Sequence, residues 1–215
     1  MVFQDRFDAG RRLAVALEQY RDEDPIILGL PRGGVAVGYE IARTLAAPLD
    51  VLVVRKLGAP GAEEFAIGAI APGATLLNRD LVAGLGVPQE YLARIIAREG
   101  DELARRERVY RGTRPPVAVE GCTVILVDDG LATGATAQAA VESLRRRRPS
   151  KIVFAAPVCS AEGAKALEQV ADAVVCLECP PEFGAVGYWY RDFSPTTDAE
   201  VIKCLLATES RRIPA

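Results

Sequence analysis

The residues best placed to do chemistry lie in one short segment, Val124 to Thr136, which reads VILVDDGLATGAT. Its first four residues are all apolar, which is typical of a parallel strand buried on both faces. Asp128 and Asp129 follow where that strand leaves the sheet. The next turn leads into an Ala-rich stretch that we expect to be helical. Because the first N–H groups of a helix are unpaired and its dipole attracts anions, this turn is predicted to bind a phosphate group.

The whole segment resembles the phosphoribosyl pyrophosphate (PRPP) loop of type I phosphoribosyltransferases, in which a hydrophobic strand, two adjacent acids and a Thr-Gly-x-Thr turn follow one another. The resemblance implies that Asp128 and Asp129 are catalytic, hold the ribose hydroxyls and contact Mg²⁺ through water. It also implies that five residues of the turn bind the 5′-phosphate: Ala132, Thr133, Gly134, Ala135 and Thr136. The competing interpretation is an acidic strand end followed by a capped helix, which any α/β protein can contain.

A second strand-loop-helix junction lies upstream, where a short apolar strand is followed by Arg32, Gly33 and Gly34. Paired glycines let a ligand approach the backbone, and an arginine can bind phosphate oxygens through two N–H groups. The junction resembles the pyrophosphate loop of the same family. In that family the peptide before the basic residue can be strained or cis, so we predict an unusual peptide between Pro31 and Arg32. The alternative is an ordinary turn with a solvated arginine.

The next apolar strand ends in Arg55 and Lys56, followed by a Gly/Pro loop. This ending is similar to the corresponding strand of adenine-type phosphoribosyltransferases. A cation at the carboxyl end of a strand is well placed to neutralise the charge that develops on departing pyrophosphate. We therefore expect Arg55 and Lys56 to bind pyrophosphate and Lys56 to take part in catalysis.

Aromatic residues gather near the C-terminus, between Glu182 and Phe193. This stretch resembles the hood of hypoxanthine-type phosphoribosyltransferases, and four of its residues are predicted to bind the nucleobase: Phe183, Val186, Tyr188 and Trp189. The spacing is one residue longer than in that hood, and Arg191 stands where an acid is expected. Position 132, where purine-specific members often carry a carboxylate, is alanine. The acceptor base and any general base therefore stay unassigned, and the aromatic side chains could instead seal the end of the sheet.

The predicted fold class is α/β, a doubly wound and mostly parallel six-stranded sheet with a small hood. Strands alternate with helices, which favours a parallel sheet with right-handed crossovers. The resemblance implies the order 3-2-1-4-5-6, with strand 3 antiparallel at the edge. The expected strands cover residues 26–30, 50–54, 65–70, 123–127, 152–156 and 173–177.

One domain is expected to span residues 1–215, with hood or cap elements around 71–118 and 180–198. Within the first of these regions, Pro88 is expected to start a long polar helix that ends near Arg111. Acids and arginines alternate along this helix, which is typical of an exposed face with i,i+4 ion pairs. The region is interpreted as a cap over the site or a contact between subunits.

Composition excludes several classes of function. The chain has 215 residues, a net charge of −3 and no histidine. The missing histidine excludes Ser-His-Asp hydrolases and H-E-x-x-H metalloproteases, and the negative charge argues against a nucleic-acid coat. No signal-peptide core and no membrane-length apolar span is evident, so a cytoplasmic location is expected. The five cysteines are more typical of reduced thiols than of a disulfide framework.

The resemblance as a whole implies a Mg²⁺-dependent phosphoribosyltransferase. Its expected partners are PRPP and a small nitrogenous acceptor, without membrane or nucleic acid. The family often dimerises, which makes a homodimer an open expectation. The alternative from another class is a regulatory protein on the same fold that senses PRPP without turning it over.

Overall fold

Five parallel strands form the central sheet of the computed structural model, which describes residues 2–209 apart from the side chains of Glu64 and Glu209. The strand order is β2-β1-β6-β7-β8. The strands are β1 (Ile26–Gly29), β2 (Leu49–Val51), β6 (Thr123–Val127), β7 (Lys151–Val158) and β8 (Ala173–Glu178). The order reverses between β1 and β6, and this is where ligands bind in open α/β sheets.

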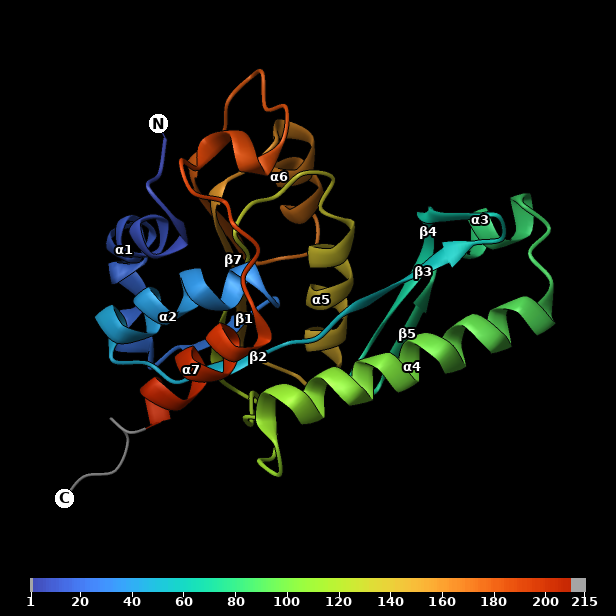
Figure 1. Cartoon of the computed structure of the whole chain (residues 1–215), viewed down its shortest axis with the longest axis horizontal. Coiled ribbons are helices and arrows are strands. Elements are labelled where there is room, and N and C mark those ends of the chain that lie inside the picture. The colour runs from blue at the N-terminus through green and yellow to red at the C-terminus, as the bar shows by residue number, and fades with distance from the viewer. Residues whose placement is uncertain (1, 210–215) are drawn as a thin grey trace.

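Helices cover both faces of this sheet (Figure 1). One face carries α1 (Arg6–Ala16), α2 (Gly33–Leu45) and α7 (Asp198–Glu209), and the other carries α5 (Ala135–Arg146) and α6 (Ala161–Leu167). Alternation along the strands explains the division: Ile27 and Ile125 pack in the first core, and Leu28 and Leu126 pack in the second. Two short 3₁₀ helices, η1 (Glu18–Glu23) and η2 (Val186–Trp189), lie in the connections.

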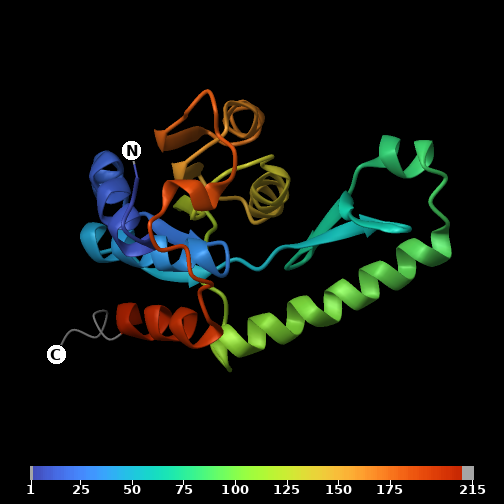
Figure 2. The ribbon, with the colours of Figure 1, turned by 45° about the horizontal axis from the view of Figure 1, so that its top comes forward.

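Residues 55–111 extend from this body as an arm (Figure 2). The arm has its own antiparallel sheet of β3 (Arg55–Ala59), β4 (Ala62–Ala71) and β5 (Ala74–Leu77), followed by α3 (Arg79–Gly84) and α4 (Gln89–Arg111). A small separate core joins the sheet to α4 and includes Leu57, Ile67, Leu92 and Ile95. The predicted long helix from Pro88 to about Arg111 is confirmed.

The predicted six-stranded sheet is wrong in one strand. Residues 65–70 belong to β4, which pairs with β3 and β5 and not with the edge of the central sheet. Ile67 is fully buried within the arm, so its apolar side chain needs no place in the main core. The predicted strand 50–54 also ends early, at Val51. The order of the other five strands is as expected.

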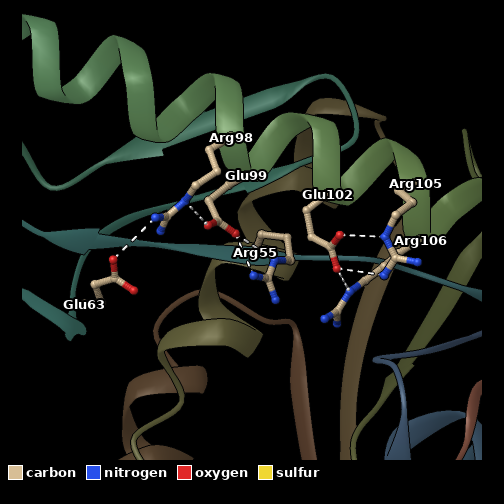
Figure 3. A network of polar contacts seen from close by, with 7 residues as sticks. All are labelled: Arg55, Glu63, Arg98, Glu99, Glu102, Arg105 and Arg106. Atoms are coloured by element: carbon tan, nitrogen blue, oxygen red, sulfur yellow. Dashed lines mark hydrogen bonds and ion pairs between the residues drawn. The ribbon is translucent and has the colours of Figure 1, made fainter.

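The face of α4 carries the expected acid-arginine pairs (Figure 3). Glu102 accepts hydrogen bonds from Arg105 and Arg106, each at 2.7 Å. Spacings of three and four residues bring such side chains together on a helix surface. On this exposed face of α4, the charges of the acids and arginines therefore neutralise one another within the helix.

The expectation that all cysteines are reduced thiols is wrong. Cys159, which follows β7, and Cys176 of β8 form a disulfide. The two strands are neighbours in the sheet, which brings the two cysteines within reach across 17 residues of sequence. Cys122, Cys179 and Cys204 are free thiols. Separately, none of the helices within residues 2–209 combines the length and apolar character that crossing a bilayer requires.

Candidate active site

The diglycine loop and the acid pair lie in direct contact at the carboxyl end of the sheet. The N–H of Leu30 donates to the carbonyl oxygen of Val127 at 2.8 Å. A Cβ atom on Gly33 would overlap Oδ2 of Asp129, and one on Gly34 would overlap the Val127 carbonyl oxygen. Only glycine leaves room for this approach. The two segments are therefore adjacent, although they lie about a hundred residues apart in sequence.

The turn at residues 132–136 begins α5, as expected of a phosphate-binding turn. Gly134 precedes the helix with φ at +78°, in the left-handed region that favours glycine. The preceding loop is held by the β7–α6 connection: the N–H of Ser160 donates to the Leu131 carbonyl oxygen at 2.8 Å, and its hydroxyl donates to the Ala132 carbonyl oxygen. These two hydrogen bonds hold the loop before α5, whose first N–H groups have no partner within the helix.

Each acid of the pair has one carboxylate oxygen committed to the protein. The N–H of Asp129 donates to Oδ1 of Asp128 at 2.9 Å, and Nε of Arg6 donates to Oδ2 of Asp129 at 2.7 Å. Within the described residues, Oδ2 of Asp128 and Oδ1 of Asp129 accept no hydrogen bond.

The pKa values of both acids are displaced upward. Burial raises the pKa of Asp128 well above its usual range, and the charge of Asp129 raises it further. Burial also raises the pKa of Asp129, while the hydrogen bond and charge of Arg6 oppose that rise. The protein thus holds two carboxylates side by side with one cation to neutralise them. A site of this kind attracts a second cation or a set of sugar hydroxyls.

Arg6 is a site residue that sequence reasoning missed. Its side chain is 11% exposed and pairs with Asp129 from the first turn of α1, where Asp5 caps the helix by accepting from the N–H of Asp8 at 2.7 Å. Nothing in the sequence near Arg6 distinguishes it from Arg11 and Arg12 of the same helix. Only the crossing of α1 over the sheet end brings it to the acids.

The predicted pyrophosphate-binding cations lie in different surroundings. Lys56 is exposed in a cavity of about 280 Å³ that it shares with Ala135 at the start of α5. Arg32 is exposed, follows a cis peptide from Pro31 as predicted, and has Nη1 4.0 Å from Oδ1 of Asp198. The side chain of Arg55 points into the arm, where its Nη2 lies 2.7 Å from Oε2 of Glu99 (Figure 3).

The predicted base-binding residues divide into two groups. Val186 packs against the loop that begins with Asp128 and Asp129, which we call the acid loop. The contact is close enough that a Cβ atom on Gly130 would overlap Cγ1 of Val186. Phe183, Tyr188 and Trp189 instead line an open hollow of about 440 Å³ together with Val2 and Glu182.

Tyr190 makes a contact with the acid pair that the sequence did not predict. Its hydroxyl donates to the backbone carbonyl oxygen of Asp129 at 2.6 Å, and its ring is buried. Tyr190 also pairs through its backbone with Phe3, so the N-terminal segment and the aromatic segment meet beside the site.

The carboxylate oxygens of the acid pair fit a Mg²⁺ ion that the protein and the substrate bind together. Among the described residues no group of three or more acids or cysteines is placed to hold a metal alone. Mg²⁺ is usually bound by one or two carboxylates and completes its shell with water and phosphate oxygens. The two carboxylates of Asp128 and Asp129 match this requirement.

Comparisons with known proteins agree with this geometry. Residues 3–191 match the model of the phosphoribosyl transferase domain. A protein of Mycobacterium tuberculosis, present in strains CDC 1551 and H37Rv and named as a candidate phosphoribosyl transferase, is 44% identical over 205 residues. The match covers 95% of this chain and 46% of that protein, so the chain spans about half the length of these relatives. The crystal structure of TT1426 from Thermus thermophilus is 45% identical, covers 96% of this chain and 99% of its own, and superposes with a TM-score of 0.86. The chain therefore belongs to the phosphoribosyl transferase domain family.

Proposed function

We propose that this protein is a Mg²⁺-dependent phosphoribosyltransferase that transfers phosphoribose from PRPP to a nitrogenous base or a related acceptor and releases pyrophosphate. The observation that carries the proposal is the contact between Gly33 and the carboxylate of Asp129, with the phosphate turn at the start of α5 following the same strand. Two loops that we propose to bind phosphate groups and two acids then lie at the same end of the sheet. This arrangement suits a sugar that carries phosphate groups at both ends.

Binding the 5′-phosphate fixes the geometry of the reaction. The outward N–H groups of residues 132–136 and the hydroxyls of Thr133 and Thr136 would hold this phosphate. The ribose would then lie over the acid pair with its anomeric carbon between the two loops. Holding the reactants in this way lowers the entropic part of the barrier.

The transition state carries opposite charges at its two ends. The bond from the anomeric carbon to pyrophosphate breaks, pyrophosphate leaves with the bonding electrons, and the acceptor nitrogen forms the new bond on the opposite face. Asp128 and Asp129 would stabilise positive charge on the ribose, and Lys56, Arg32 and the Gly33 backbone would stabilise the leaving group. Mg²⁺ would supply further neutralisation of the pyrophosphate oxygens.

Arg55 is proposed to bind pyrophosphate only after leaving its partner. Its ion pair with Glu99 occupies the guanidinium in the structure. The acceptor is proposed to lie against Val186, which packs on the acid loop, with Phe183, Tyr188 and Trp189 as the neighbouring aromatic surface. A cytoplasmic homodimer is part of the same proposal.

A PRPP-sensing regulator on this fold is the second candidate. Ala132 is compatible with it, because the carboxylate that assists proton transfer in purine members of the family is absent at that position. Such a protein would bind PRPP through the same contacts and release no pyrophosphate.

A pyrophosphate-release screen distinguishes the two functions. PRPP and Mg²⁺ would be incubated with purines, pyrimidines and related amides, with the Asp128→Asn and Asp129→Asn double variant as the matched control. Release that depends on one acceptor and is lost in the control supports the transferase. PRPP binding without release by any acceptor, together with binding to RNA or DNA, supports the regulator. No PRPP binding at all rejects both.

A further inference from the structure

Arg6 joins three parts of the site that come from distant parts of the chain. Its Nε donates to Oδ2 of Asp129 at 2.7 Å, and its Nη1 donates to the Ser194 carbonyl oxygen at 2.8 Å. A Cβ atom on Gly33 would lie 2.8 Å from this same Nε. Its guanidinium lies 4.0 Å from the ring centroid of Phe193. The acid pair, the diglycine loop and the C-terminal aromatic segment therefore meet at one side chain.

The chemistry of these contacts is specific to arginine. The planar guanidinium stacks on the Phe193 ring while two of its N–H groups donate in different directions. A lysine carries the same charge but cannot make both hydrogen bonds and the stacking contact together. At 11% exposure the side chain is also too buried to serve only as a solvated surface charge.

From this geometry we infer that Arg6 is a positioning residue for Asp129 and for the aromatic segment at residues 190–194. It holds Oδ2 of Asp129, so that Oδ1 is the oxygen presented to the substrate. It also fastens Tyr190 and Phe193 next to the acids, and Tyr190 strengthens the link by donating to the Asp129 carbonyl oxygen at 2.6 Å. The effect of Arg6 on PRPP rests on the proposed function, whereas the effect of Arg6 on the segment at residues 190–194 does not.

Two readouts test the inference. The first is the affinity for PRPP with Mg²⁺ and the pyrophosphate-release rate of Arg6→Gln and Arg6→Lys. Misplacing a catalytic group by about 1 Å can cost about 10²-fold in rate. We expect a loss of that order in kcat/KM for Arg6→Gln and about 10-fold for Arg6→Lys. Arg11→Gln is the matched control, because Arg11 lies on the same helix and is half exposed.

The second readout needs no activity. Trp189 is the only tryptophan in the sequence and adjoins Tyr190, so its fluorescence reports on the aromatic segment. We expect acrylamide to quench Trp189 at least about twofold more efficiently in Arg6→Gln than in the wild type, with Arg6→Lys between them and Arg11→Gln unchanged. Should Arg6→Gln fail to fold, Phe193→Leu keeps both hydrogen bonds of Arg6 and removes its stacking contact, together with the contact between the Phe193 and Tyr190 rings, whose centroids lie 5.0 Å apart. This variant is expected to increase the quenching in the same direction.

The outcomes separate this inference from the proposed function. If the wild type neither binds PRPP nor releases pyrophosphate, the proposed function fails, and the quenching experiment alone decides whether Arg6 holds the aromatic segment. If the wild type is active but Arg6→Gln matches Arg11→Gln in both readouts, the inference is overturned. Wild-type behaviour of Arg6→Lys in both readouts would overturn the geometric part of the inference, because the positive charge alone would then be sufficient.

Discussion

Replacing Asp128 with asparagine is expected to stabilise the protein while abolishing its function. The substitution keeps the oxygen that accepts the Asp129 N–H at 2.9 Å and removes a charge that burial and a neighbouring carboxylate both disfavour. Asparagine is close to isosteric with aspartate, so no cavity opens. The contact that Asp128 makes with the protein survives, and only the charge required by a ligand disappears.

The sign of the pH dependence follows from the raised pKa. A carboxyl group with a raised pKa in the folded state holds its proton more tightly than in the unfolded chain. The free-energy cost of burying the charge of Asp128 is absent below pH 3.8, the ordinary pKa of an aspartate. This cost grows as the pH rises toward the pKa of Asp128 in the folded state, and it is complete above that pKa. The stability difference between Asp128→Asn and wild type should therefore be largest at neutral pH and shrink in acid.

The size of the expected stability change follows from the cost of burying a polar group without a full set of hydrogen-bond partners. This cost is about 1–3 kcal/mol, and more when the group is charged. For a chain of this length each kcal/mol shifts Tm by about 2–4 °C. Asp128→Asn should thus raise Tm by at least about 2 °C at pH 7 in the absence of Mg²⁺. Asp129→Asn should lower Tm, because it leaves the poorly exposed Arg6 without its carboxylate.

Thermal denaturation followed by circular dichroism at pH 7 and pH 4 tests this pair of variants. A lower Tm for Asp128→Asn, or a higher Tm for Asp129→Asn, would refute the reasoning that Asp129 is paired with Arg6 whereas the buried charge of Asp128 has no ion pair among the described residues.

Three further predictions concern Gly33, the two cations Arg55 and Lys56, and Tyr110 of α4, whose hydroxyl donates to Oδ1 of Asp198 at 2.8 Å. Gly33→Ala should remove PRPP binding and lower Tm by several degrees, because its Cβ would overlap Oδ2 of Asp129; calorimetry and thermal denaturation check this, and unchanged binding contradicts it. Lys56→Ala should weaken PRPP binding about tenfold, since it removes a charged phosphate contact. Arg55→Gln should also weaken PRPP binding if Arg55 leaves Glu99 to bind pyrophosphate, and unchanged binding by this variant in a calorimetric titration would contradict that role. Burial and Asp198 raise the pKa of Tyr110 to about 12, so stability should fall as the pH rises from about 10 toward 12. In an absorbance titration, Tyr110→Phe should remove the ionisation of one tyrosine that has its midpoint near pH 12. If this ionisation is still seen in the variant, another tyrosine is responsible.

The sequence predicted the parts of the molecule where chemistry and folding impose the same pattern. Val124 to Val127 had to be a buried strand, and the acids and glycines after β6 and β1 had to meet because both loops leave neighbouring parallel strands at the same end. The cis peptide before Arg32 came only from the resemblance to a known family.

The sequence was less informative where tertiary contacts decide the outcome. Residues 65–70 are apolar enough to belong to either sheet. They lie in the arm because Ile67 packs in the small core between the arm's sheet and α4. Arg6 and Arg55 are two of many arginines, and their partners Asp129 and Glu99 lie 123 and 44 residues away in sequence. No local pattern encodes such distant pairings.

Calorimetric titration of PRPP with Mg²⁺ tests the central claim most directly. Wild-type protein is expected to bind one PRPP per chain with a dissociation constant in the micromolar range, about −8 kcal/mol. The Asp128→Asn and Asp129→Asn double variant is expected to show no measurable heat of binding although it remains folded. Equal binding by both proteins would contradict the claim that the acid pair and the diglycine loop enclose the activated sugar.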